Sequence, residues 1–363
     1  MASKYWPALD GLRGACIITV LVSHLSSAYS GGFIGVNLFF VLSGFLITGK
    51  LLNEWQETGT LSFKAFYLSR VRRLMPALLV MLLLSGVLWH FLVPRLSFIK
   101  AIIPVLFYYG NWTGVRFAGP LAPTWSLCIE EQFYLVWPVL FSGLLLLVPN
   151  VRSVARLTLI LAACLALMRG LLFYAESPLA AYDSTLACAD SILMGSAFAL
   201  LNGESQRDFW KGGRGTLIGL ACAGTLIVLS FFITADSDFL GLGGFTIISG
   251  YSVAIILHSL HAPGGFLGSI LTVQWLVEIG KRSYGIYLYH MPVFLALDHF
   301  FGKKLAFGTS VALKVLVTLG VSMLSYRFVE LPFLRKKVFL GKEPAAEQAC
   351  DPLPSHLQKS AVR

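Results

Sequence analysis

The sequence predicts an all-α polytopic membrane protein, and three observations lead to that class. Of its 363 residues, 56% are hydrophobic and only 13% are charged, whereas a soluble domain carries about a quarter charged residues. The mean hydropathy of the chain is +0.75. About ten apolar runs follow one another, most of them about 20 residues long, which is the length of helix that crosses a hydrocarbon core. These observations exclude a water-soluble protein.

The apolar runs are separated by polar or Gly- and Pro-containing stretches and lack the alternation of a membrane β-barrel, so we expect helices. The first run is followed at once by a second and has no small-residue cleavage site. It is therefore expected to remain as a helix and not to be removed as a signal peptide. In order, the predicted spans cover residues 12–29, 34–52, 75–93, 124–148, 156–174, 186–202, 215–234, 240–258, 283–301 and 307–328.

The distribution of basic residues predicts the orientation of these spans. The net charge is +10, and most of the 28 Lys and Arg residues lie in the connections on one side. By the positive-inside rule that side is cytoplasmic, and both termini lie there. The charge thus reflects topology, and no nucleic-acid partner is expected. Residues 1–340 are predicted to form a single transmembrane domain and residues 341–363 a disordered cytoplasmic tail. The connections on the other side carry only Arg95, Lys100, Arg116, Lys303 and Lys304.

The first predicted helix carries two ionisable residues on one face. Arg13 and His24 are eleven residues apart, which is about 16 Å of helix rise and three turns. Arg13 lies at the cytoplasmic edge of that face and His24 toward the outer leaflet, so one stripe connects the two sides of the membrane. Ionisable residues inside spans are costly and indicate function. The alternative is an arginine that extends to the interface and a hydrogen-bonded structural histidine.

An arginine cluster precedes Pro76 at the cytoplasmic start of the third predicted span. Arg70 and Arg73 are three residues apart, so a helical turn directs both to one side, with Arg72 between them. Guanidinium groups bind phosphates through paired hydrogen bonds, so the cluster suits a multiply anionic cytosolic ligand. The alternative is ordinary topology signalling together with contact to lipid headgroups.

The fourth predicted span begins with aromatic and acidic residues. Glu130 and Glu131 are adjacent and therefore about 100° apart around a helix. We expect one of them to line a cavity and the other to anchor a neighbouring helix. The rings of Trp125 and Tyr134 flank them and are suited to holding a sugar, although both could equally belong to the interfacial aromatic belt.

Polar residues on five predicted helices come out at one depth, within about 10 Å of the outer boundary. This coincidence predicts one buried, partly hydrated cavity in which a histidine among carboxylates acts as a general base. The alternative, for three of them, is an interhelical clamp of Arg169 with Asp190 or a glutamate. His290, before Pro292, fits either a helix kink or a direct role. No metal site is expected, because the six cysteines show no C-x-x-C spacing. The residues at this depth are His24, Asn37, Glu130, Glu131, Arg169 and Asp190.

Six motifs in this order resemble the membrane-bound acyltransferase family 3, the bacterial O-acyltransferases that modify surface polysaccharides and related glycans. The resemblance covers about residues 5–338. Its carriers are the stretch 9–14 with the spacing from Arg13 to His24, the stretch 35–47, the Arg70, Arg73 and Pro76 group, Trp-Ser-Leu followed by Glu-Glu-Gln-Phe-Tyr in 125–134, Ser-Tyr-Gly-Ile-Tyr-Leu-Tyr-His in 283–290, and 325–330.

The resemblance implies an integral protein of the bacterial inner membrane that takes an acyl group, usually acetyl, from cytosolic acyl-CoA. The acceptor would be a hydroxyl of a glycan or lipid-linked sugar. By the same resemblance His24 is catalytic, Arg13 positions the donor, and Arg70 and Arg73 hold the nucleotide phosphates. Many members carry Asp where this chain has Asn37, which can bind the imidazole but supplies no charge. Glu130, Glu131 or Asp190 could supply it instead.

The residues leave two mechanisms and two other functions open. His24 either removes a proton from the acceptor hydroxyl or forms a transient acyl-histidine. A glycolipid transporter or flippase would also have buried charges in a multi-helix cavity, although no internal repeat is visible. A structural or sensing membrane protein is disfavoured, because polar groups on five helices would then be costly without a purpose.

Overall fold

The computed structural model describes residues 5–26, 28–92, 98–148, 150–302 and 304–335, and all regular elements in these ranges are helices. The predicted tail, 341–363, lies outside the described residues. The elements are α1 (Pro7–Leu25), α2 (Gly32–Thr58), α3 (Phe63–Leu92), α4 (Phe98–Leu106), η1 (Gly110–Thr113), η2 (Val115–Phe117), η3 (Gly119–Leu121), α5 (Thr124–Leu147), α6 (Val151–Ala175), α7 (Pro178–Asp183), α8 (Thr185–Leu201), α9 (Glu204–Lys211), α10 (Gly213–Phe232), η4 (Leu240–Gly244), α11 (Phe245–His261), α12 (Phe266–Leu271), α13 (Gln274–Lys281), α14 (Ser283–Phe301), α15 (Phe307–Ser325), η5 (Tyr326–Glu330) and α16 (Leu331–Leu334).

Each of the ten predicted apolar runs falls on a helix, which confirms an all-α polytopic membrane protein. Eight helical stretches of the described chain are long and apolar enough to span a membrane: α1, α2, α3, α5, α6, α10, α11 with η4, and α15 with η5 and α16. The other two predicted runs are α8, which has 17 residues, and α14, whose tyrosine and histidine side chains make it less apolar.

The largest difference in the predicted boundaries concerns the third helix. The predicted apolar span began at residue 75, just after the arginine cluster, whereas α3 begins at Phe63 and continues through Pro76. Arg70 and Arg73 therefore lie within a continuous helix. A proline inside a helix removes one backbone hydrogen bond and crowds the carbonyl four residues earlier, but it does not always end the helix. Residues 63–75 are mostly acceptable helix formers, so the helix extends into the polar stretch before the predicted span.

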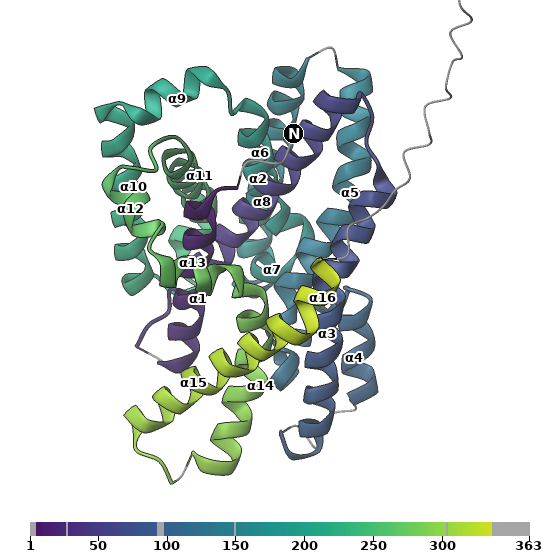
Figure 1. The fold of residues 1–363 in the computed structure, drawn as a ribbon, viewed down its shortest axis with the longest axis vertical. Coiled ribbons are helices and arrows are strands. Elements are labelled where there is room, and N and C mark those ends of the chain that lie inside the picture. Colours follow the sequence, from purple (N-terminus) through teal and green to yellow (C-terminus); the bar gives the residue numbers. More distant parts are fainter. Residues whose placement is uncertain (1–4, 27, 93–97, 149, 303, 336–363) are drawn as a thin grey trace, which may run out of the picture.

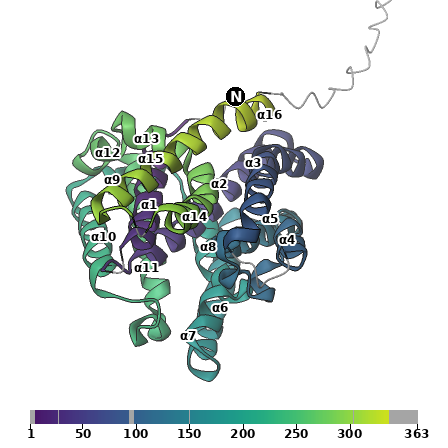
Figure 2. The ribbon, with the colours of Figure 1, turned by 90° about the horizontal axis from the view of Figure 1, so that it is seen from below.

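The centre of the molecule is formed by α2 and α8, which lie between α10–α12 on one side and α3–α5 on the other (Figure 1, Figure 2). The backbones of α2 and α8 approach closely because glycines face the partner helix. A Cβ added at Gly44 would lie 1.8 Å from the carbonyl oxygen of Ile192, and one at Gly195 would lie 2.0 Å from that of Val41. Small residues permit such contacts in membrane helix pairs.

Short helices fill the predicted connections and were not expected. The predicted span α14 packs against α3, α15 and α1, and two of the short helices, α12 and α13, pack against α1. Their apolar segments are too short to span a membrane, so hydropathy alone does not reveal them. The result is that α1, α3, α5 and α14 surround one region, to which each contributes polar side chains.

Candidate active site

Two neighbouring cavities share a wall. The first, of about 130 Å³, is called the arginine cavity and is lined by residues that include Arg13, Ser43, Arg70, Arg73, Glu130 and Tyr134. The second, of about 320 Å³, is called the histidine cavity and is lined by residues that include Ser23, His24, Arg116, Trp125, Tyr182 and Met291. Val36 and Tyr287 line both cavities, so these two side chains separate them.

The arginine cavity collects three cations from two helices. Arg13 comes from α1, where its Nε donates to Ser283 Oγ at 3.3 Å, and Arg70 and Arg73 lie one turn apart on α3. The Arg70 guanidinium lies 5.3 Å from the centroid of the Tyr134 ring. Within the described chain none of the three arginines forms an ion pair, so their charge is available to an anion. Arg72, from the same cluster, does not line the cavity.

The two adjacent glutamates of α5 point in different directions. Glu130 lines the arginine cavity and accepts a hydrogen bond from Tyr134 Oη at 3.2 Å. Glu131 lines neither cavity, and its Oε1 is buried without a hydrogen-bond partner in the described structure. The 100° turn between neighbours on a helix accounts for this separation. Neither carboxylate is a hydrogen-bond partner of His24.

His24 occupies the histidine cavity with an exposed ring. Its Nδ1 lies 2.8 Å from the carbonyl oxygen of Val20, one turn earlier on α1. A carbonyl oxygen can only accept, so in the neutral ring Nδ1 carries the proton and Nε2 holds a lone pair. The backbone therefore sets the tautomer that a general base requires. This is the orienting role that the sequence reasoning assigned to a carboxylate or to Asn37.

The histidine cavity is also lined by a cation that lies against two neighbouring aromatic rings. The Arg116 guanidinium lies 4.4 Å from the centroid of the Tyr182 ring and 5.8 Å from that of Trp125. The two rings are themselves 4.7 Å apart. Sequence reasoning named Trp125 but missed Tyr182, and it treated Arg116 only as an outer charge. The one available signal was the long connection between the third and fourth runs, because a loop of that length is often functional.

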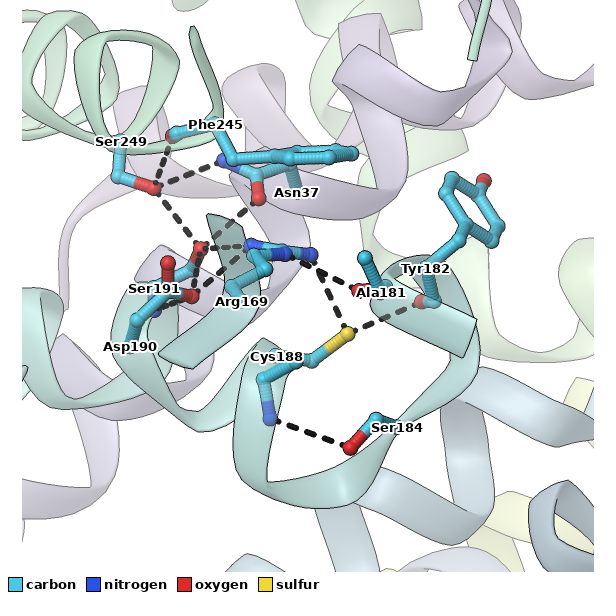
Figure 3. A network of polar contacts seen from close by, with 11 residues as sticks. Asn37, Arg169, Ala181, Tyr182, Ser184, Cys188, Asp190, Ser191, Phe245 and Ser249 are labelled. Atoms are coloured by element: carbon cyan, nitrogen blue, oxygen red, sulfur yellow. Dashed lines mark hydrogen bonds and ion pairs between the residues drawn. The ribbon is translucent and has the colours of Figure 1, made fainter. Parts of the chain in front are cut away.

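The predicted single cavity is wrong, because four of its six residues, Glu131 among them, line neither cavity. Asn37, Arg169 and Asp190 are buried in a separate network between α2, α6, α8 and α11 (Figure 3). Arg169 Nη1 donates to Asp190 Oδ1 at 2.9 Å, which is the interhelical clamp considered as the alternative. Depth along a helix axis does not determine the direction of a side chain around it, so equal depth did not imply a shared cavity.

Asn37 takes part in that network and is not a hydrogen-bond partner of His24. Its Nδ2 donates to Ser249 Oγ at 2.9 Å, and its Oδ1 accepts from Ser191 Oγ at 2.9 Å (Figure 3). Ser249 Oγ in turn lies 2.9 Å from Ser191 Oγ. These contacts tie α2 to α8 and α11. An amide, which both donates and accepts, suits this position between two hydroxyls.

The network also holds the segment that carries Tyr182. Arg169 Nε donates to the carbonyl oxygen of Ala181 at 3.2 Å, and Cys188 Sγ donates to that of Tyr182 at 3.1 Å (Figure 3). The Arg169 guanidinium lies over the ring of Phe245, 3.7 Å from its centroid. Arg169 and Asp190 therefore position one wall of the histidine cavity from behind.

Comparison with known proteins places the chain in a family. The profile of a family described as an acyltransferase domain matches residues 6–327. The chain is 33% identical over 357 residues to the peptidoglycan O-acetyltransferase OatA of Listeria monocytogenes, covering 93% of this chain and 57% of that protein. It is 35% identical over 350 residues to the putative peptidoglycan O-acetyltransferase YrhL of Bacillus subtilis, covering 91% and 55%.

The O-acetyltransferase OatA of Staphylococcus aureus is 32% identical over 354 residues, covering 93% of this chain and 58% of that protein. The chain thus spans a little more than half the length of these relatives. No solved structure matches it. The family profile covers most of the chain, and every lining residue named above for the two cavities falls within the matched range. The chain therefore belongs to the acyltransferase 3 family of multi-pass membrane proteins.

Proposed function

We propose that the protein is an O-acetyltransferase of the bacterial cytoplasmic membrane that transfers acetyl from cytosolic acetyl-CoA to a hydroxyl of a cell-wall glycan. One observation carries this proposal. Arg13 and His24 lie on the same helix and line adjacent cavities, so a cationic site and a basic site face each other across the wall formed by Val36 and Tyr287.

The arginine cavity is suited to the phosphates of the donor. Planar guanidinium groups bind phosphate oxygens in pairs, and Arg70 and Arg73 lie one turn apart without an ion-pair partner in the described chain. Arg13 lines the same cavity as these residues and precedes His24 by eleven residues on α1. An extended pantetheine arm would cover the rise of about 16 Å between Arg13 and His24 and bring the thioester to the imidazole.

His24 supplies the base for the transfer. Its Nε2 takes the proton from the acceptor hydroxyl as that oxygen attacks the thioester carbonyl. The carbon–sulfur bond then breaks, the CoA thiolate leaves, and the imidazolium returns the proton to it. The products are an acetyl ester and free CoA. In the other mechanism, His24 Nε2 attacks the thioester carbonyl, the carbon–sulfur bond breaks and the CoA thiolate leaves. The acetyl-imidazolium then passes the acetyl group to the hydroxyl, whose proton goes to the thiolate, and free His24 is restored.

The identity of the acceptor rests on the relatives. Two of them are named as peptidoglycan O-acetyltransferases, one of these as putative. The exposed ring of His24 in a cavity with Trp125 and Tyr182 suits a sugar, because aromatic faces pack against sugar rings. A glycolipid transporter is the second candidate, and it too would use two cavities separated by a narrow wall.

A reconstituted assay separates these functions. The purified protein in lipid vesicles is given labelled acetyl-CoA and muro-oligosaccharides, and both free CoA thiol and labelled sugar are measured. The proposal expects both products from the wild type and from His299→Ala, an exposed histidine of α14 that lines neither cavity. His24→Ala should give neither. Movement of oligosaccharide without CoA release would instead establish a transporter.

A further inference from the structure

Among the arginines of the described chain that lie over aromatic rings, Arg169 and Arg116 have different surroundings. Arg169 lies over Phe245, and its guanidinium also donates to Asp190, Ser191, Ala181 and Cys188. Its charge is therefore balanced by Asp190, and its N–H donors have acceptors within the protein. Arg169 serves as an internal reference for a structural arginine.

Arg116 lacks such partners. It lies against Tyr182 and Trp125, yet its Nη1 is buried and has no hydrogen-bond partner in the described structure. No acidic residue of the described chain forms an ion pair with it, although the guanidinium and Asp183 interact electrostatically. A buried donor without an acceptor is costly. A cationic donor of this kind indicates a site that an anion completes.

The segment that carries Arg116 is fixed in place. Arg116 lies in η2, directly after η1, and Asn111 of η1 donates through Nδ2 to Thr185 Oγ1 at 2.9 Å and to the carbonyl oxygen of Asp183 at 3.0 Å. Gln132 of α5 donates to Asn111 Oδ1 at 3.0 Å and accepts from Thr185 Oγ1 at 2.6 Å. A preorganised guanidinium loses little freedom when a ligand binds.

The position of Arg116 relates it to the acceptor and not to the donor. It lines the histidine cavity with His24 and does not line the arginine cavity. A sugar packed on Trp125 or Tyr182 would have its hydroxyl directed to His24 and a neighbouring substituent at Arg116. The donor phosphates have their own cations in the other cavity.

We propose that Arg116, Trp125 and Tyr182 form an anion subsite of the histidine cavity, which selects acceptor glycans that carry a carboxylate or phosphate oxyanion beside the sugar ring. This inference rests on the proposed function, because it assigns the acceptor class at the same site. The oxyanion has two possible sources, the lactyl carboxylate of a muramic acid or the pyrophosphate of a lipid-linked sugar, and both suit a guanidinium.

The test measures acceptor binding and acetyl transfer separately, with the full chain in lipid vesicles. Three oligosaccharides of equal length are compared: a neutral chitooligosaccharide, a muro-oligosaccharide with a free lactyl carboxylate, and the same compound with that carboxylate converted to an amide. A lipid-linked pyrophosphate sugar forms a fourth arm. The variants are Arg116→Gln, Arg116→Lys and, as a control, Lys304→Gln, which removes an exposed positive charge outside both cavities.

The proposal expects Arg116→Gln to weaken binding of the carboxylate or pyrophosphate acceptor about tenfold to a hundredfold. Binding of the neutral and amidated sugars and the KM for acetyl-CoA should stay unchanged. Arg116→Lys should lose less, because it keeps the charge without the planar fork, and Lys304→Gln should match the wild type. The arm that responds to Arg116 identifies the source of the oxyanion.

Equal loss for charged and neutral acceptors, or no loss for any acceptor, would overturn the subsite. The outcome for the proposed function is read separately. If Arg116→Gln weakens binding of the charged acceptors only but the wild type transfers no acetyl group, the subsite is supported and the transferase is refuted. If the wild type transfers acetyl but the variant affects charged and neutral acceptors alike, the transferase is supported and the subsite is refuted. Melting of each variant in detergent at the wild-type temperature shows that the comparison concerns folded protein.

Discussion

The imidazole rings of His24 and His290 meet edge to face, with their centroids 5.0 Å apart. Nδ1 of His24 lies 2.8 Å from the carbonyl oxygen of Val20, and Nδ1 of His290 lies 2.6 Å from that of Tyr287. Each ring is thus oriented by its own helix. Because His290 is fully buried while His24 is exposed, His290 forms a fixed surface against which the reactive ring packs.

We predict that His290 acts as a positioning residue through this ring contact. His290→Ala should lower kcat about tenfold, because a misplaced base loses part of its catalytic effect, while the KM for acetyl-CoA should not change. His290→Phe keeps an aromatic ring against His24 and should retain most of the activity. Steady-state kinetics of both variants provide the measurement. Equal losses for Ala and Phe would show that the ring contact does not matter.

A second prediction concerns the donor site. Replacing Arg70 and Arg73 together with Gln should raise the KM for acetyl-CoA at least tenfold with a smaller effect on kcat, because hydrogen bonds to charged groups contribute about 1.5–3 kcal/mol each. Arg72→Gln is the matched control, since Arg72 belongs to the same cluster but does not line the cavity. An unchanged KM in the double variant would show that Arg70 and Arg73 do not bind the donor and would favour the alternative, that they set the membrane topology.

The buried ion pair between Arg169 and Asp190 should govern stability. Arg169→Leu leaves the Asp190 carboxylate without its partner, and breaking a buried pair from one side costs about 3–5 kcal/mol. The double variant Arg169→Leu with Asp190→Leu removes both charges and should recover much of the loss. Thermal melting in detergent gives the comparison. Asp190→Leu completes the cycle. If the double variant lost as much stability as Arg169→Leu and Asp190→Leu added together, the pair would not be coupled.

Close packing of α2 and α8 leads to a fourth prediction. Gly195→Ala should destabilise the protein by about 1–3 kcal/mol, because the new Cβ would lie 2.0 Å from the carbonyl oxygen of Val41. Gly224→Ala in α10 is the control, since nothing lies within 4 Å of a Cβ at that position. It should be neutral or slightly stabilising. Similar melting temperatures for the two variants would argue against the close contact.

Hydropathy predicted the long helices well. A segment inside a membrane must form all its backbone hydrogen bonds internally, so a long apolar run of this kind is expected to be a helix. The arginine cluster, with its spacing of three residues, also predicted that Arg70 and Arg73 face one way. The grouping around His24 could not be obtained in the same manner. Glu130 and Asn37 have depths similar to that of His24, yet their directions around the helix axes depend on how the helices pack.

The short helices explain the other residues that sequence reasoning missed. Arg116 and Tyr182 lie in η2 and α7, which are too short to give a periodic pattern. Their places in the histidine cavity are fixed by Asn111 and Arg169, through contacts that join segments distant in the sequence. Such contacts are tertiary and leave no local signal.

The central claim is that His24 performs acyl transfer to a cell-wall glycan, and mass spectrometry of that glycan tests it most directly. Glycans would be compared from cells that express the wild type, His24→Ala or His299→Ala at equal protein levels. The account predicts sugars heavier by one acetyl group with the wild type and His299→Ala, and none with His24→Ala. Acetylated sugars at wild-type levels in the His24→Ala cells would contradict it.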